Sequence, residues 1–194
     1  MKLFGPLYDK VMGWSRHKHA VRYLSAVSFM ESSFFPVPTA LMLAPMVMAE
    51  RDKAWTLAAI ATITSVAGGL FGYLIGFFLF EQMGKPILAF YGLEGKFVDM
   101  KTWFDQYGIW LVLLAGVTPI PYKLFTITSG VLGLAVIPFT LASIVGRASQ
   151  FFLVAALVWW GGKKIEPVLD QWIELIGWGL LALAVAGFLI IKVI

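Results

Sequence analysis

The chain has 194 residues, of which 60% are hydrophobic and only 13% are charged. Soluble domains are about half apolar and about a quarter charged. The composition therefore excludes a soluble enzyme, a nucleic-acid module or a disordered linker as a description of the whole chain. It indicates an integral membrane protein, whose formal net charge of +4 we attribute to basic loops that face anionic lipid and the cytoplasm.

Cysteine is absent from the sequence, which excludes disulfides, thiol nucleophiles and thiolate metal sites. The two histidines, His17 and His19, lie in one short basic stretch and do not have the spacing of a metal site. No nucleophile and base can be paired within the apolar segments. We therefore expect no metal, no cofactor and no enzymatic activity, and the N-terminal residues lack the pattern of a cleavable signal peptide.

In chain order, residues 1–19 mix apolar and cationic side chains, which predicts an amphipathic helix at the membrane interface. The apolar block from about Val21 to Ala49 follows, and it contains Pro36 and Pro38. Each proline removes a backbone donor and disfavours helix at the residue before it. Non-helical backbone at membrane depth is tolerated only inside protein or along a wet cavity. The block is thus predicted to be a re-entrant hairpin, with two helical arms of about 10–14 residues.

Residues 54–80 contain no proline and are predicted to span the membrane as one helix. Gly68, Gly72 and Gly76 recur every four residues, a spacing that lets another helix backbone approach closely. Residues 81–107 are polar and are predicted to form an interfacial loop and a second amphipathic helix.

A second apolar block, from about Ile109 to Ile137, contains Pro119 and Pro121, 83 residues after the first pair of prolines. A predicted spanning helix over residues 139–160 and a final apolar helix over residues 172–191 follow it. Each proline pair lies after an amphipathic stretch and before an unbroken helix. The sequence therefore predicts an internal duplication, which is typical of transporters whose site lies between two halves.

The predicted fold is an all-α integral membrane protein, a single transmembrane domain over residues 1–194. Residues 1–83 form the first repeat, residues 84–162 the second, and residues 163–194 a C-terminal transmembrane helix. Each repeat consists of an amphipathic helix, a proline-broken re-entrant hairpin and a spanning helix. Nine lysine and arginine residues lie on the predicted N-terminal side of the membrane, against four on the other. This asymmetry favours a cytoplasmic N-terminus and inverted repeats.

Three charged residues fall within apolar blocks: Glu31, Lys123 and Arg147. Charges at membrane depth are costly and should face protein or water. If the repeats oppose each other, Lys123 and Arg147 would surround an anion, and Glu31 would be the titrating or gating group. Phosphate is the favoured anion because arginine binds it bidentately, and a carboxylate stays open. In the alternative interpretation, Glu31 forms a purely structural ion pair with Arg147 or Lys123.

The sequence resembles the DedA family of bacterial membrane proteins, part of the VTT (SNARE-associated Golgi protein) superfamily. The resemblance covers residues 20–162 and is greatest to the small YqaA-like branch. It depends on Phe29-x-Glu31 before the first proline pair, on the Gly116–Gly130 segment with its prolines and Lys123, and on Gly146-Arg147.

This resemblance implies two opposed re-entrant hairpins in the bacterial inner membrane that flip or scramble an anionic lipid. That lipid would be a polyprenyl phosphate, such as undecaprenyl phosphate, or a phospholipid, with a link to the proton-motive force. Glu31 matches the acidic residue of the family's first hairpin and Lys123 the basic residue of its second. Thr39 and Ala40 stand where the family commonly has a second carboxylate.

Two other functions stay open at this point: a proton-coupled transporter of a small ion, and a non-transporting membrane scaffold. We expect an anionic lipid and the membrane as partners, and no nucleic acid. Whether the chain forms a homo-oligomer stays open.

Overall fold

The computed structural model describes residues 17, 19–34, 38–92, 94–118 and 121–161. Their elements are all helical, which confirms the predicted all-α class. They are α2 (Ala20–Ser33), α3 (Ala40–Ala49), η1 (Arg51–Lys53), α4 (Ala54–Leu79), η2 (Phe80–Gly84), α5 (Lys85–Tyr91), α6 (Glu94–Val117), α7 (Tyr122–Leu132) and α8 (Val136–Gly161). The predicted C-terminal helix over residues 163–194 and most of the predicted interfacial helix over residues 1–19 lie outside the described residues.

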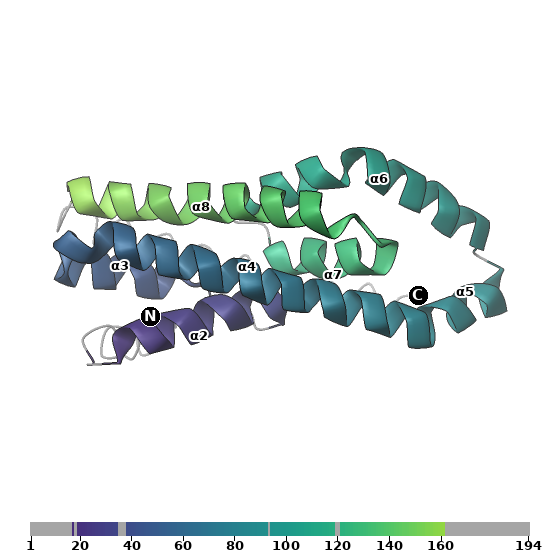
Figure 1. Cartoon of the computed structure of the whole chain (residues 1–194), viewed down its shortest axis with the longest axis horizontal. Coiled ribbons are helices and arrows are strands. Elements are labelled where there is room, and N and C mark those ends of the chain that lie inside the picture. Colours follow the sequence, from purple (N-terminus) through teal and green to yellow (C-terminus); the bar gives the residue numbers. More distant parts are fainter. Residues whose placement is uncertain (1–16, 18, 35–37, 93, 119–120, 162–194) are drawn as a thin grey trace, which may run out of the picture.

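Two long helices, α4 and α8, pack side by side through the middle of the molecule (Figure 1). Each has 26 residues, which at about 1.5 Å per residue exceeds the roughly 30 Å of a bilayer's hydrocarbon core. Within the described residues, Arg51–Gly84 and Val136–Gly161 are the two segments long and apolar enough to cross a membrane. The structure thus places two candidate spans where the sequence predicts them.

The helices α2 and α3 lie at one end of this pair, with α2 against α4 and α3 against α8 (Figure 1). Both have their inner ends near the middle of the long helices. There, the Ser33 hydroxyl donates to the Gly68 carbonyl of α4 at 2.9 Å. The arms contain 14 and 10 residues and are separated by the segment that carries the first proline pair.

The helices α6 and α7 occupy the other end, with α7 against α4 and α6 against α8 (Figure 1). The Tyr73 phenol of α4 donates to the Leu134 carbonyl at 2.7 Å, and the Lys101 ammonium of α6 donates to the Leu132 carbonyl at 2.7 Å. These bonds fix the C-terminal end of α7 against both of its neighbours.

One predicted boundary is wrong. The amphipathic helix of residues 81–107 and the first arm of the second apolar block were expected as separate elements, but α6 runs unbroken from Glu94 to Val117. Phe104, Gly108 and Val112 are buried at intervals of four residues, so one apolar face passes through the predicted boundary. Asp99 and Asp105, two of the polar residues that suggested a boundary, are exposed on the same helix.

The glycine stripe of α4 brings both ends of the molecule onto one helix. A methyl group at Gly68 would overlap the Phe29 carbonyl of α2, and one at Gly76 would overlap the Ile127 carbonyl of α7. A methyl group at Gly146 of α8 would lie 2.9 Å from the Leu113 carbonyl of α6. Packing of backbone on backbone is therefore the role of these glycines, as their spacing predicts.

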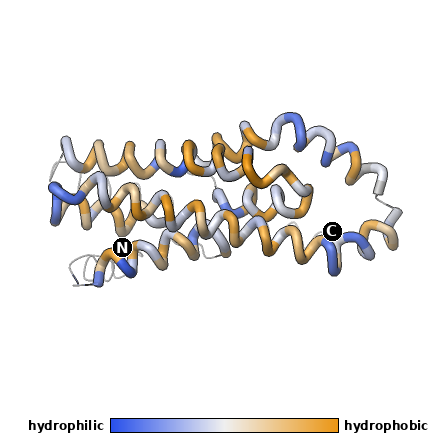
Figure 2. Tube along the Cα trace, in the orientation of Figure 1, coloured by the Kyte–Doolittle hydropathy of each residue, from blue (hydrophilic) through white to orange (hydrophobic). Residues whose placement is uncertain are grey.

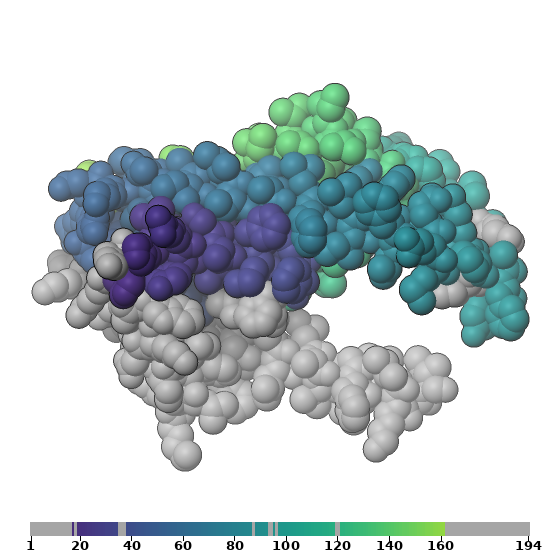
Figure 3. Space-filling view, turned by 60° about the horizontal axis from the view of Figure 1, so that its bottom comes forward, coloured from purple at the N-terminus to yellow at the C-terminus, as the bar shows by residue number. Residues whose placement is uncertain are grey.

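Polar residues gather at the two ends of the helix pair, and apolar residues lie between them (Figure 2). Glu50 pairs with Lys53 at 2.5 Å at one end, and Glu81 pairs with Lys85 at 2.7 Å at the other. Trp55 stacks on Phe152, with ring centroids 6.1 Å apart. In the space-filling view, α2 lies along the flank of α4 (Figure 3). An apolar band between polar ends is the pattern of a protein that sits in a bilayer.

Candidate functional site

One proline of each pair, Pro38 and Pro121, lies within the described residues. Each precedes the first turn of a helix. The Pro38 carbonyl accepts a hydrogen bond from the Leu41 amide at 3.1 Å, and the Pro121 carbonyl accepts one from the Leu124 amide at 3.1 Å. A proline at a helix start removes an N–H group that would have no helical partner there. The other two predicted break residues, Pro36 and Pro119, lie outside the described residues.

Arg147 is the largest buried polar side chain described, with 1% of its surface exposed, near the middle of α8. Its Nε donates to Ser65 Oγ of α4 at 2.5 Å, and one terminal nitrogen donates to Gln150 Oε1 at 2.7 Å. The other terminal nitrogen lies 3.3 Å from Glu31 Oε2 of α2. The guanidinium thus joins α8 to α4 and to α2.

Two aromatic rings flank the guanidinium. Its central carbon lies 4.4 Å from the centroid of the Phe151 ring and 5.1 Å from that of the Tyr122 ring. Cation–π contacts are strongest where the cation is desolvated. Ring faces and neutral oxygens therefore share the stabilisation of Arg147 with one carboxylate.

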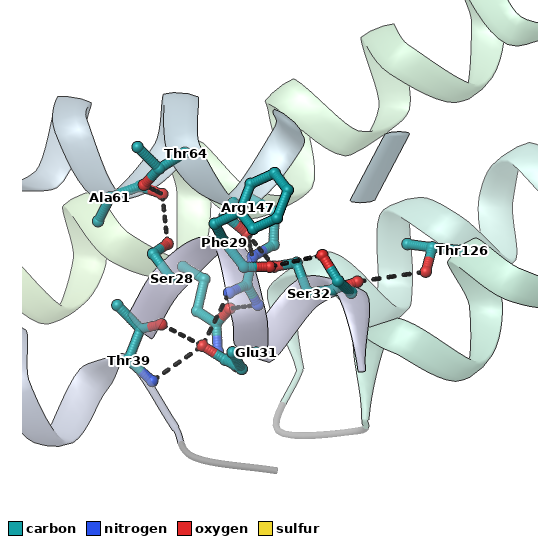
Figure 4. Close-up of polar contacts among 12 residues, drawn as sticks. Ser28, Phe29, Glu31, Ser32, Thr39, Ala61, Thr64, Thr126 and Arg147 are labelled. Atoms are coloured by element: carbon teal, nitrogen blue, oxygen red, sulfur yellow. Dashed lines mark hydrogen bonds and ion pairs between the residues drawn. The ribbon is translucent and has the colours of Figure 1, made fainter. Parts of the chain in front are cut away.

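Glu31 connects the two arms of the first hairpin to α8 (Figure 4). The same carboxylate oxygen that faces Arg147 accepts hydrogen bonds from the Thr39 amide, at 2.8 Å, and from the Thr39 hydroxyl. The Glu31 side chain keeps 22% exposure, against 2% for the Arg147 side chain. The Glu31 carboxylate therefore caps the N-terminal end of α3. It is also the more solvent-accessible partner of the ion pair with Arg147.

Lys123 lies in the first turn of α7 and is partly buried. Its ammonium is within electrostatic reach of Glu31, but no described residue forms an ion pair or a hydrogen bond with that ammonium. The structure therefore brings Glu31 and Arg147 into contact, with Lys123 nearby and unpaired within the described part of the chain. Two cations and one carboxylate leave this cluster with a net positive charge.

Serine and threonine hydroxyls bind α2 to the long helix and to α7. The Ser28 hydroxyl donates to the Ala61 carbonyl at 2.7 Å, and the hydroxyls of Ser32 and Ser65 are 2.6 Å apart. The Thr126 hydroxyl lies 3.4 Å from the Ser32 carbonyl (Figure 4). Hydroxyls thus satisfy backbone groups at the inner end of the first hairpin without adding charge.

Sequence reasoning found the three charges but missed several of their partners. Ser65 lies one turn before Gly69 on the buried face of α4, and Gln150 lies three residues after Arg147, so both had a detectable helical signal. Thr39 stood out only because the DedA family commonly has a carboxylate at this place, and its role as a hydrogen-bond donor to Glu31 was not foreseen. Tyr122, beside the second proline pair, carried no such signal. No cluster of three or more metal-binding side chains lies among the described residues.

The comparisons with known proteins agree with this architecture. The family model of the VTT domain matches residues 35–159. An uncharacterised protein of Haemophilus influenzae is 43% identical over 192 residues, which are 99% of this chain and 100% of that protein. An uncharacterised protein of Histophilus somni is 40% identical over the same shares.

A Staphylococcus aureus protein named undecaprenyl phosphate transporter A is 33% identical over 99 residues, which are 47% of each chain. No solved structure matches the chain significantly. The VTT-domain match runs from α3 through nearly all of α8 and includes Arg147, whereas α2 with Glu31 lies before it. It agrees with the resemblance inferred from the sequence. This chain is a membrane protein of the VTT-domain (DedA) family.

Proposed function

We propose that the protein transports an anionic lipid across the bacterial inner membrane by flipping or scrambling it, with polyprenyl phosphate as the first candidate and phospholipid as the second. The observation that carries this proposal is the buried Arg147, which shares its cluster with one carboxylate and a second, unpaired cation. An excess positive charge at membrane depth is expensive without a counter-ion. A phosphate headgroup would supply that counter-ion.

The proposed topology is two inverted repeats, residues 1–83 and 84–162, each with a re-entrant hairpin, followed by a C-terminal transmembrane helix. It is supported by the exchange of partners between the halves, since α3 packs on α8 and α7 on α4. The matched first turns after Pro38 and Pro121 support it as well. Hairpins that enter from opposite sides and meet at mid-depth can open the site to one side at a time.

In the proposed mechanism, the Glu31 carboxylate occupies the position of the transported anion. It accepts hydrogen bonds from Arg147, from the Thr39 amide and from the Thr39 hydroxyl, a donor set that also suits a phosphate oxygen. An entering headgroup would compete with Glu31 for these donors, and Lys123 would attract it towards the hairpin tips. Protonation of Glu31 removes its charge and favours the headgroup, which provides the link to the proton-motive force.

The name of the S. aureus relative supports the choice of lipid. That protein is named for the transport of undecaprenyl phosphate, and it shares 33% identity over a 99-residue segment. A polyprenyl phosphate carries its charge in a small headgroup on a long apolar chain. The headgroup could pass the Arg147 cluster while the chain stays in the bilayer.

The test is a flip assay in proteoliposomes that contain undecaprenyl phosphate or phosphatidylglycerol. Arg147→Lys keeps the charge but loses the planar fork, and Arg51→Gln in the exposed η1 is the matched control for loss of a cation. We expect flipping by the wild type and by the control, and little by Arg147→Lys. A wild type that flips neither lipid but carries a small anion or protons would identify the ion transporter instead. A wild type that transports neither a lipid nor an ion would support the non-transporting membrane scaffold.

The proposed topology has its own test, because the chain contains no cysteine. Single cysteines replacing Lys53 and Asp99 should react with a membrane-impermeant maleimide from opposite sides of the membrane. One should be labelled in inverted membrane vesicles and the other in intact cells. With the N-terminus cytoplasmic, the Lys53 position should be the cytoplasmic one. Labelling of both positions from the same side would refute the proposed crossing by α4.

A further inference from the structure

Two buried hydroxyl groups beside Arg147 make no well-formed hydrogen bond with the described residues. Tyr122 is 3% exposed and Ser143 is fully buried, and their side chains are neighbours. Neither Tyr122 Oη nor Ser143 Oγ makes a well-formed hydrogen bond with any described residue. A bond between the two hydroxyls would use one of their two donor hydrogens. At least one buried donor at this place therefore has no partner among the described residues and requires an explanation.

Their position relates them to the charged cluster. Ser143 lies one helical turn before Arg147 on α8, and the Tyr122 ring packs under the guanidinium. The phenol oxygen lies against α4 at Gly69, since a methyl group at Gly69 would be 2.9 Å from it. Gly69 in turn lies one turn after Ser65, the residue that accepts from Arg147 Nε. The two hydroxyls therefore flank Arg147 from the α7 half, whereas Glu31 approaches from the α2 half.

Arg147 itself has donors to spare. A guanidinium has five N–H groups, and the described residues accept three hydrogen bonds from this one, at Ser65, Gln150 and Glu31. Two N–H groups and two hydroxyl groups thus remain available next to a buried positive charge. An oxyanion with several acceptor oxygens can accept from all of these groups and also offsets the buried positive charge, whereas a water molecule supplies no charge.

We propose that the Tyr122 and Ser143 hydroxyls form a second half of the headgroup site and donate to phosphate oxygens bound by Arg147. This inference rests on the proposed lipid transport and deepens it. A phosphate monoester has three terminal oxygens, whereas a phosphodiester has two. Donors on both sides of Arg147 therefore select a monoester headgroup, such as that of a polyprenyl phosphate, over a diester phospholipid.

The experiment uses the full chain with Tyr122→Phe, Ser143→Ala and the double variant. Tyr73→Phe and Ser129→Ala are the matched controls, because these buried hydroxyls are already bonded to the Leu134 and Phe125 carbonyls. Flipping rates are measured against the content of undecaprenyl phosphate or phosphatidylglycerol in proteoliposomes. Unfolding temperatures are measured in detergent by tryptophan fluorescence.

We expect Tyr122→Phe to unfold at the wild-type temperature or above it, since the change removes a buried polar atom that makes no well-formed hydrogen bond with the described residues. The half-saturating content of undecaprenyl phosphate should rise about tenfold, as for the loss of a hydrogen bond to a charged group. The rise for phosphatidylglycerol should be smaller. Tyr73→Phe should do the opposite, with a lower unfolding temperature and unchanged half-saturation.

Wild-type half-saturation in Tyr122→Phe, Ser143→Ala and the double variant would overturn this inference and leave the proposed transport intact. An equal rise for both lipids would overturn the selection of a monoester. A wild type that flips neither lipid would overturn the proposed function, and this inference with it. Ser143→Ala keeps the test decisive if Tyr122→Phe does not fold.

Discussion

A double-mutant cycle on Glu31 and Arg147 separates the structural role of their ion pair from its role in transport. The three variants are Glu31→Gln, Arg147→Gln and the combination. At the observed 3.3 Å separation and an effective dielectric constant of about 20, the gross attraction is about 5 kcal/mol. Desolvation of the two charges offsets much of it, and the 22% exposure of Glu31 reduces it further.

We therefore expect each single variant to lose about 3 kcal/mol of unfolding free energy, because each leaves one charge unpaired. The double variant should lose less than the sum, with a coupling energy of about 2 kcal/mol. It should also remain inactive, since it lacks the cation that binds the headgroup. A double variant that loses about 4 kcal/mol, less than the summed loss of about 6 kcal/mol, and that stays inactive is the expected signature of a site whose charges serve transport.

The assay is denaturant unfolding in detergent, followed by the fluorescence of the eight tryptophans, together with the flip assay. Glu81 and Lys85 provide a matched control cycle. Their charges are closer, at 2.7 Å, but 44% and 57% of the side chains are exposed, so their coupling should stay below about 0.5 kcal/mol. Coupling that small at Glu31 and Arg147 would refute a structural role for their ion pair. Wild-type flipping by the double variant would refute the anion site.

Three further predictions concern packing, the second cation and the hairpin cap. Gly130→Ala should lower the unfolding free energy by about 3 kcal/mol, because its methyl group would overlap the backbone of α4; Gly95→Ala, with open space around it, should raise stability by about 0.5–1 kcal/mol. Lys123→Gln should slow flipping and change stability by less than about 0.5 kcal/mol in denaturant melts, since it forms no described ion pair. Thr39→Val should lower the unfolding free energy by about 1 kcal/mol in denaturant melts, because it removes a hydrogen bond to the Glu31 carboxylate; wild-type stability would count against this cap on α3.

The helices could be predicted from local sequence rules wherever those rules were strong. Paired prolines located the interruption between α2 and α3, whose lengths of 14 and 10 residues fall within the range predicted for the two arms. Long apolar runs located α4 and α8. The continuity of α6 could not be predicted, because Phe104 and Val112 share a face that only the packed structure reveals as buried. The sequence changes from polar to apolar near Ile109, but α6 continues through this position without a break.

The site was predictable as a set of charges and not as a set of contacts. An ionisable residue in an apolar segment is a local signal, so Glu31 and Arg147 stood out. The partners that decide their geometry come from other helices: Ser65 from α4 and Tyr122 from α7. Their side chains are ordinary in sequence, and only the crossing of four helices at one depth makes them neighbours of a guanidinium.

The contact between Glu31 and Arg147 joins residues that are 116 positions apart, and this separation affects how the protein is made. At synthesis rates of about 10 residues per second, the carboxylate of α2 leaves the ribosome about ten seconds before its partner. During that interval, a charge at membrane depth would have no counter-ion. On the proposed topology, α2 and α3 should therefore stay near the membrane interface during insertion and reach their final depth only when α8 arrives.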